Sequence, residues 1–179
     1  DEMLTPDQVQ AYRRDGYLVV DNVLSATQLA TLHQVIDTLV QASREVTDHN
    51  QIYDLEPTHS ADEPRVRRIK EPHNVHPAFR EIAFSPKIAE ILTPLIGTTS
   101  GIRYQTGKLN MKAAAYGAAV EWHQDWAFYP HTNDDLLAMG LYLNDCGPDN
   151  GPLMVIPGSH TWPISDHHAD GVFCGAIDP

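Results

Sequence analysis

Glu121-Trp-His-Gln-Asp-Trp126 is the stretch that decides the fold, together with Asn150-Gly-Pro-Leu-Met-Val-Ile-Pro-Gly-Ser-His160 downstream. In an extended strand, residues two apart project to the same face. His123 and Asp125 can therefore offer an imidazole nitrogen and a carboxylate oxygen to one metal ion. Two histidines and one carboxylate on one face of iron(II) leave the opposite face open for other ligands. The stretch thus predicts two of the three donors of such a site.

The surroundings of the His-Gln-Asp triplet make the pattern more specific. Trp122 and Trp126 flank it, and the apolar run 136–143 follows after a polar loop. A Gly- and Pro-containing turn and a short apolar segment, which Pro157-Gly158 ends, come next. This passage resembles the phytanoyl-CoA dioxygenase family of iron(II)/2-oxoglutarate oxygenases, which includes ectoine hydroxylase. In that family the first two metal ligands sit in a His-x-Asp motif, and an Asn-Gly-x-Leu-x-x-(Ile/Leu)-Pro-Gly-(Ser/Thr)-His stretch follows it.

The opening of the chain resembles the same family. Asp15-Gly-Tyr-Leu-Val-Val20 and the helical pattern after it are typical of its members, so the resemblance runs from about Leu4 to Ile177. It implies a mainly β fold with flanking helices, namely a double-stranded β-helix of the cupin-like, jelly-roll kind. We expect one oxygenase domain over 1–179, with a helical and strand part at about 1–100 and jelly-roll strands at about 101–179.

Local signals predict three helices in the first hundred residues. Thr5 and Pro6 begin the first, which Asp15-Gly16 ends, and Ser25 caps a second helix with apolar residues at three- and four-residue spacing. A third is expected near Pro77–Leu95. Residues 17–21 resemble a strand, whereas the proline-rich, polar stretch 43–80 predicts a long irregular excursion.

The predicted strands of the second half are Ile102–Asn110, Val120–Trp122, Leu136–Leu143, Leu153–Ile156 and Val172–Ile177. They are too few for an eight-stranded double sheet, so we expect that its C-terminal strands are missing from this chain. The family's distal histidine ligand and the residue that anchors 2-oxoglutarate, usually Arg, are then expected after Pro179. A guanidinium suits that role because it binds a carboxylate through two parallel hydrogen bonds.

The first residue, Asp1, supports this interpretation, because a chain without an initial Met is expected to be a fragment or the ordered part of a longer protein. The alternative is that a histidine within the chain supplies the third ligand: His160, His167 or His168. His160 belongs to the Pro-Gly-Ser-His turn, which is a structural element in the family.

Two residues are assigned to 2-oxoglutarate binding by the resemblance. Lys108-Leu-Asn-Met-Lys112 alternates like a half-buried strand and resembles the strand of ectoine hydroxylase whose Asn contacts 2-oxoglutarate, which assigns that contact to Asn110. Gln124 matches a residue that lies near the cosubstrate in the phytanoyl-CoA enzymes. The alternative for both is structural: Asn110 satisfying backbone groups in a sheet, and Gln124 as a packed polar residue.

Two further groups have both a functional and a structural interpretation. The basic run Arg65, Arg67, Arg68 and Lys70 either attracts an anionic substrate or forms a solvated face paired with Asp62, Glu63 and Glu71. Trp126, Phe128 and Tyr129 form either an apolar wall beside the metal or an ordinary part of the core.

Composition excludes some classes of protein. The net charge of −12 over 179 residues argues against a nucleic-acid or anionic-membrane partner. No run approaches the ~20 apolar residues of a membrane span, and no signal-peptide pattern opens the chain. The two cysteines lack zinc-ligand spacing, so a cytoplasmic location is expected. Nothing in the sequence indicates an oligomeric state.

The predicted function is an iron(II)/2-oxoglutarate-dependent dioxygenase that hydroxylates a small organic molecule, with dioxygen and 2-oxoglutarate converted to succinate and carbon dioxide. Two alternatives stay open: a non-catalytic jelly-roll binding protein, and a hydrolytic metal site on the same fold. A CoA-thioester substrate is disfavoured, because Leu141 stands where the phytanoyl-CoA hydroxylase has a Trp.

Overall fold

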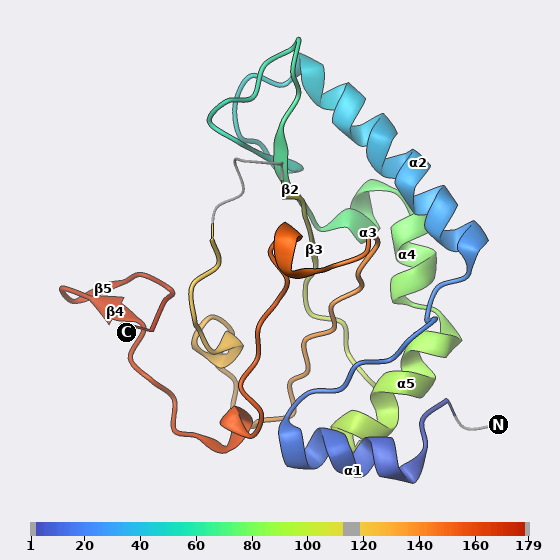
Figure 1. The fold of residues 1–179 in the computed structure, drawn as a ribbon, viewed down its shortest axis with the longest axis vertical. Helices are drawn as coiled ribbons and strands as arrows, with labels where there is room; N and C mark the ends of the chain where they lie inside the picture. Colours follow the sequence, from blue (N-terminus) through green and yellow to red (C-terminus); the bar gives the residue numbers. More distant parts are fainter. Residues whose placement is uncertain (1–2, 113–118, 178–179) are drawn as a thin grey trace.

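The computed structural model describes residues 3–112 and 119–177. Helices dominate its first half and loops its second half (Figure 1). In chain order the elements are α1 (Pro6–Asp15), α2 (Ala26–Ala42), η1 (Ser43–Glu45), β1 (Tyr53–Leu55), β2 (Val66–Lys70), α3 (Pro72–Val75), α4 (Pro77–Ala83), α5 (Pro86–Ile96), β3 (Lys108–Asn110), η2 (Asp125–Ala127), η3 (Pro148–Asn150), η4 (Ser159–Thr161), β4 (His168–Ala169) and β5 (Val172–Phe173).

The ends of the first two helices lie where the sequence predicts them. The side chain of Thr5 accepts a hydrogen bond from the backbone N–H of Gln8, and the side chain of Gln8 accepts one from the backbone N–H of Thr5. Ser25 and Gln28 repeat this arrangement at α2. Gly16 ends α1 in the left-handed conformation. Each capping box satisfies two N–H groups that the first helical turn leaves without partners.

The predicted third helix is two helices. Ser85 accepts a hydrogen bond from the N–H of Ile88 and begins α5, with Pro86 at its first position. Because Ser and Pro at these two positions favour a new helix start, the chain breaks after α4 instead of continuing. The prediction of one helix over Pro77–Leu95 was therefore wrong at this point.

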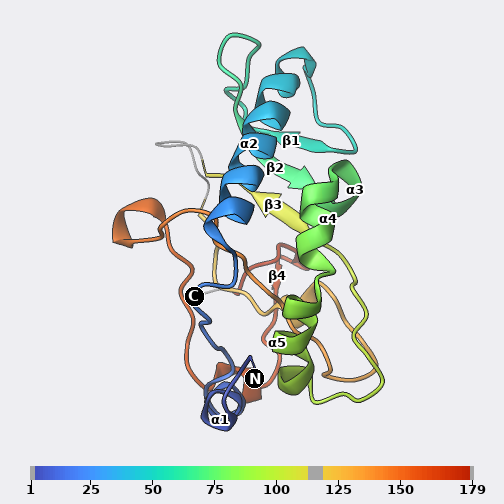
Figure 2. The same cartoon turned by 90° about the vertical axis from the view of Figure 1, so that its right-hand side faces the viewer.

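One antiparallel sheet, with strand order β1-β2-β3, forms the core together with α2 and α4 (Figure 2). Tyr53 and Leu55 of β1 and Val66 and Ile69 of β2 are buried against Leu39 and Val40 of α2. Leu32 of α2 packs against Phe79 and Ile82 of α4. At the other end of the molecule, α1 lies beside α5.

The prediction of an irregular excursion over 43–80 was wrong, because β1, β2 and α3 lie in it. The prolines suggested an irregular stretch, but Pro57 and Pro64 fall in the connection between β1 and β2 and not in the strands. β1 pairs with β2, and β2 pairs in turn with β3, some forty residues later in the chain. Such pairing leaves little trace in a local pattern.

The second half contains fewer strands than predicted. In the described residues, strand is found at Lys108–Asn110 within the predicted 102–110 and at Val172–Phe173 within 172–177. Residues 17–21, 120–122, 136–143 and 153–156 are not strands. A strand exists only where a neighbouring strand pairs with its N–H and C=O groups in a regular ladder, and in the described ranges these segments belong to no such ladder. The described residues are therefore not mainly β, although β4 and β5 form a second, two-stranded sheet. No helix in 3–112 or 119–177 is long and apolar enough to cross a membrane.

Candidate metal and cosubstrate site

The side chains of His123 and Asp125 lie next to each other. The Nε2 atom of His123 is 3.1 Å from Oδ1 of Asp125. Donor atoms bound about 2.1 Å from one metal ion at right angles to each other lie about 3 Å apart, so this separation suits two adjacent ligands of a single ion. The side chains are 25% and 55% exposed, which leaves the pair open on one side.

The expected reason for this proximity was wrong, although the pair itself was predicted. The triplet is not in a strand: Gln124 precedes η2, and Asp125 is the first residue of that short helix. The turn into η2 brings the carboxylate back toward the imidazole ring.

A backbone hydrogen bond selects the free nitrogen of His123. Its Nδ1 lies 2.8 Å from the carbonyl oxygen of Glu121, which can only accept, so Nδ1 carries the proton. Nε2 then faces a carboxylate oxygen, and two lone pairs this close need a proton or a cation between them. The donor set of this pair therefore fits a metal ion, in the arrangement by which backbone partners orient histidine ligands.

Residues 163–177 hold the metal-motif segment in place. The amide group of Gln124 donates to the carbonyl of Pro163 and accepts from the N–H of Ser165. The backbone N–H of Gln124 donates to Nε2 of His167, and that of Ile177 donates to the carbonyl of Trp122. Both amide atoms of Gln124 thus have backbone partners, which supports its structural interpretation, while its contact with 2-oxoglutarate stays a prediction.

The three alternative histidine ligands have other partners. His167 is 2% exposed and uses both ring nitrogens, Nε2 toward Gln124 and Nδ1 toward the carbonyl of Ser165. His160 bonds the carbonyl of Arg13 in α1, and His168 bonds Asp166. The hydrogen bond from His168 lowers the pKa of the Asp166 carboxyl below its ordinary value.

No cluster of three or more His, Cys, Asp or Glu side chains suited to a metal occurs in the described residues. All ten histidines of the chain lie in these ranges. Within the described residues the candidate site therefore has two donors, and both the metal-binding role of His123 and Asp125 and the distal histidine beyond Pro179 stay predictions.

Aromatic side chains lie beside the pair, in part as predicted. The ring of Phe128 meets that of His123 edge-on at 5.5 Å and that of Phe173 at 5.2 Å. The indole N–H of Trp126 is buried and has no hydrogen-bond partner in the described part of the chain. A cavity of about 380 Å³ adjoins this region, lined by Trp126, Ala127, Ile164, Ser165, Asp166, His167, His168 and Phe173.

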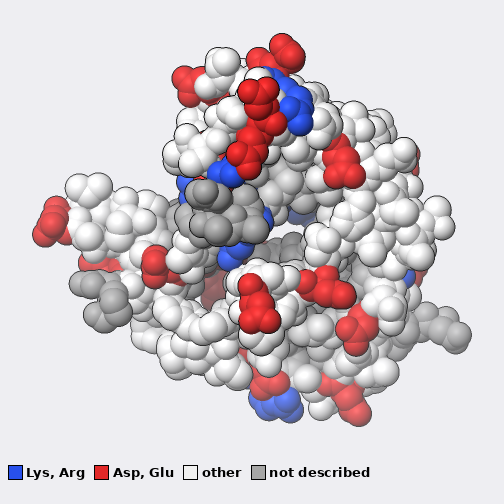
Figure 3. Space-filling view, turned by 45° about the horizontal axis from the view of Figure 1, so that its top comes forward, with Lys and Arg blue, Asp and Glu red and all other residues white. Residues whose placement is uncertain are grey.

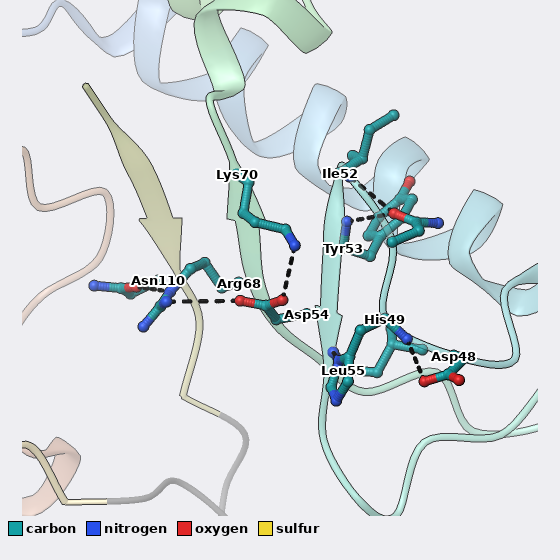
Figure 4. Close-up of polar contacts among 10 residues, drawn as sticks. Asp48, His49, Ile52, Tyr53, Asp54, Leu55, Arg68, Lys70 and Asn110 are labelled. Atoms are coloured by element: carbon teal, nitrogen blue, oxygen red, sulfur yellow. Dashed lines mark hydrogen bonds and ion pairs between the residues drawn. The ribbon is translucent and has the colours of Figure 1, made fainter. Parts of the chain in front are cut away.

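Asn110 lies at the end of β3, on the opposite face of the sheet from the buried residues. Its Oδ1 accepts a hydrogen bond of 3.2 Å from Nε of Arg68, which also lies 3.6 Å from Asp54 through Nη1 (Figure 4). The side chain is thus exposed and held by a neighbouring strand. The position suits a contact with a ligand, and the contact with 2-oxoglutarate stays a prediction.

The basic run has two kinds of partner. Arg65 pairs with Glu63, as the solvated-face interpretation predicts. Arg68 and Lys70 instead pair with Asp54 of β1, a partner that the sequence did not predict. The signal for Asp54 would have been the antiparallel pairing of β1 with β2, which the proline-rich connection conceals.

Comparison with known proteins decides the family. The family model described as "Phytanoyl-CoA dioxygenase (PhyH)" matches residues 12–173. The chain belongs to this family.

Two curated relatives are named as dioxygenases. A "probable alpha-ketoglutarate-dependent hypophosphite dioxygenase" of Stutzerimonas stutzeri is 34% identical over 173 residues, covering 96% of this chain and 59% of the relative. An "ectoine dioxygenase" of Bordetella bronchiseptica is 30% identical over 169 residues, covering 92% of this chain and 52% of the relative. The chain thus spans little more than half the length of these family members.

Solved structures of EctD from S. alaskensis have a similar fold. The structure with bound Fe matches with a TM-score of 0.60 at 26% identity, over 72% of this chain and 43% of EctD. The structure with 2-oxoglutarate and 5-hydroxyectoine matches with a TM-score of 0.57 at 25% identity and the same coverage. The fold of the chain is therefore similar to that of EctD over 72% of the chain.

Proposed function

We propose that this protein is an iron(II)- and 2-oxoglutarate-dependent dioxygenase that hydroxylates a small molecule. The observation that carries the proposal is the convergence of Nε2 of His123 and Oδ1 of Asp125, 3.1 Å apart, in a chain of the phytanoyl-CoA dioxygenase family. Both relatives are named as dioxygenases, and the matching EctD structures contain Fe or 2-oxoglutarate.

Each residue of the site has a stated role in this proposal. His123 and Asp125 hold iron(II), the backbone of Glu121 orients the imidazole ring, and Asn110 binds 2-oxoglutarate. Iron(II) and 2-oxoglutarate supply the oxidising chemistry when bound: dioxygen is consumed, 2-oxoglutarate becomes succinate and carbon dioxide, and the substrate gains a hydroxyl group. Phe128 excludes water on one side of His123.

The domain, the third metal ligand and the substrate class are proposed from the family and from the charge of the chain. We assign the described residues to one oxygenase domain whose complete form is a double-stranded β-helix, with a distal histidine as the third ligand. The substrate is a small molecule and not a nucleic acid, because the net charge of −12 repels phosphate backbones. The relatives differ in substrate, so the family does not select one.

Measurement of succinate tests the proposal. The full-length protein is loaded with iron(II) without oxygen and then given 2-oxoglutarate and air, with hypophosphite or ectoine as trial substrates. We expect succinate above the protein-free blank, and none from the His123→Ala variant. A hydrolytic or non-catalytic site would form no succinate under any of these conditions, and that result would contradict the proposal.

A further inference from the structure

A row of three polar side chains crosses the open face of the three-stranded sheet. Asp54 of β1 is the register partner of Arg68 in β2, and Arg68 is the partner of Asn110 in β3. Directly opposed residues of antiparallel strands project to the same face. The neighbouring row of Tyr53, Ile69 and Leu109 points the other way, into the core. The polar row is therefore left facing outward.

Contacts within the row fix the orientation of the Asn110 amide. Nε of Arg68 lies 3.2 Å from Oδ1 of Asn110 (Figure 4). A guanidinium can only donate, so the amide must turn its oxygen toward Arg68. Its NH2 group then points away from Arg68, and no hydrogen bond joins it to another residue in 3–112 or 119–177.

Asp54 in turn holds Arg68. One carboxylate oxygen of Asp54 lies 3.6 Å from Nη1 of Arg68, and the other lies 3.1 Å from Nζ of Lys70. The guanidinium is therefore fixed by a carboxylate on one strand while it orients an amide on the next. Its planar shape makes this possible, because Nε and the Nη atoms donate in different directions.

The charges around Asn110 favour an anion. Lys108 is the register partner of Lys70, so three cations, Arg68, Lys70 and Lys108, share this face with one carboxylate, Asp54. In a chain with a net charge of −12, this excess is local. In Figure 3 red atoms are widespread, whereas some of the blue atoms border the hollow near the middle of the view.

We propose that Arg68 is a positioning residue for 2-oxoglutarate: it holds the Asn110 amide so that its NH2 group donates to a carboxylate of the cosubstrate. Asp54 supports the same arrangement by fixing the guanidinium. The inference rests on the proposed function and adds a specific residue to it. It also explains why Arg68 of the basic run pairs across the sheet and not with the acidic residues near it in sequence.

A double-mutant cycle tests this role. Binding of 2-oxoglutarate to the full-length protein is measured by calorimetry with Mn(II) in place of iron. We expect Arg68→Met and Asn110→Ala each to weaken binding about tenfold, the loss of one hydrogen bond to a charged group. The double variant should also lose about tenfold and not a hundredfold, because both changes remove the same contact.

Two further variants separate positioning from general effects. Arg67→Met removes the same charge from the adjacent, exposed position and should leave binding unchanged. Asp54→Asn loosens Arg68 without removing it and should weaken binding about threefold in the parent but not in the Asn110→Ala background. This second variant keeps the test valid if Arg68→Met does not fold, which circular dichroism would show.

The outcomes are distinct. If the losses from Arg68→Met and Asn110→Ala multiply, Arg68 acts on the ligand by its own charge, and the positioning role is wrong while the proposed function stands. The same holds if Arg68→Met binds as Arg67→Met does. If the unchanged protein does not bind 2-oxoglutarate, the proposed function and this inference both fail.

Discussion

At His123 a single backbone contact determines which nitrogen is available. Nδ1 donates to the carbonyl of Glu121, two residues earlier, and Nε2 is left facing Oδ1 of Asp125. The chain thus presents the lone pair of Nε2 beside a carboxylate without the help of a regular strand. Such an arrangement has a net attraction only when a proton or a cation lies between the two atoms.

Replacing Asp125 should release the metal. We expect Asp125→Ala to weaken iron(II) binding at least tenfold. The change removes the anionic donor of a proposed site for which the described residues offer only two donors. Iron retained after dialysis against a weak chelator measures the effect.

Asp166→Ala is the matched control. Asp166 also lies beside a histidine, with Oδ1 2.7 Å from Nδ1 of His168, although that pair is more exposed than His123 and Asp125. The control should retain iron as the parent does. If Asp125→Ala retained as much iron as the parent and Asp166→Ala lost it, the metal site would lie at Asp166 and His168 instead.

At the scale of elements, α1 and α5 both end at a glycine in the left-handed conformation, but the surroundings of the two glycines differ. Gly16 and Gly97 both have a positive φ, 82° and 76°, but an added Cβ at Gly97 would meet nothing within 4 Å. At Gly16 it would lie 2.5 Å from Cγ and 2.9 Å from Cβ of His160. These atoms are near the backbone of η4, so the whole segment must move.

We therefore expect Gly97→Ala to lower the free energy of unfolding by about 1 kcal/mol, the cost of the left-handed conformation alone. Gly16→Ala should lower it by about 2–3 kcal/mol, because overpacking is added. Urea unfolding followed by circular dichroism gives both values. Removing the ring with His160→Ala should recover part of the Gly16→Ala loss, and equal losses at the two glycines would contradict a tight contact.

Alkaline pH should weaken the contact between α2 and β1. The hydroxyl of Tyr53 donates to the carbonyl of Leu39, and burial raises the pKa of Tyr53 above its ordinary value. The folded state therefore keeps a proton that the unfolded state releases near pH ~10, so stability is complete below that pH and falls as the pH rises further.

Tyr53→Phe tests this pH dependence. The variant should be less stable at pH 8 by about 1 kcal/mol, the value of one hydrogen bond, and lose less stability between pH 8 and 10.5 than the parent does. Tyr17→Phe, at an exposed position, is the control. An unchanged slope in Tyr53→Phe would show that another group governs the alkaline loss.

The helices α1 and α2 were predictable from the sequence and most strands were not, for a physical reason. A helix cap such as Thr5 with Gln8 acts within four residues, so local pattern reveals it. The Arg68–Asn110 pairing joins residues 42 apart in sequence, and nothing near either residue announces it. The proximity of His123 and Asp125 was predicted from their same-face spacing in a strand, although a turn and not a strand produces it.

At the scale of the whole molecule, residues 158–177 bond both the end of α1 and the segment around His123. Gly158 and His160 bond the carbonyl groups of Asp15 and Arg13 at the end of α1. Residues 163–177 then bond Trp122 and Gln124 on either side of His123. The position of His123 and Asp125 thus depends on hydrogen bonds from a segment about forty residues later in the chain, and not on a continuous sheet.

This arrangement limits what residues 1–179 can do by themselves. Among the described residues they bring two candidate ligands together, and the alternative histidine ligands, His160, His167 and His168, are bonded elsewhere. We expect a polypeptide of these residues alone to bind iron(II) weakly and to form no succinate, because a two-ligand site leaves the ion largely to water. Iron content after gel filtration, with succinate measured on the same sample, checks both expectations. Stoichiometric iron with turnover would show that the third ligand lies within the 179 residues, and that one of those three histidines leaves its present partner to bind the metal.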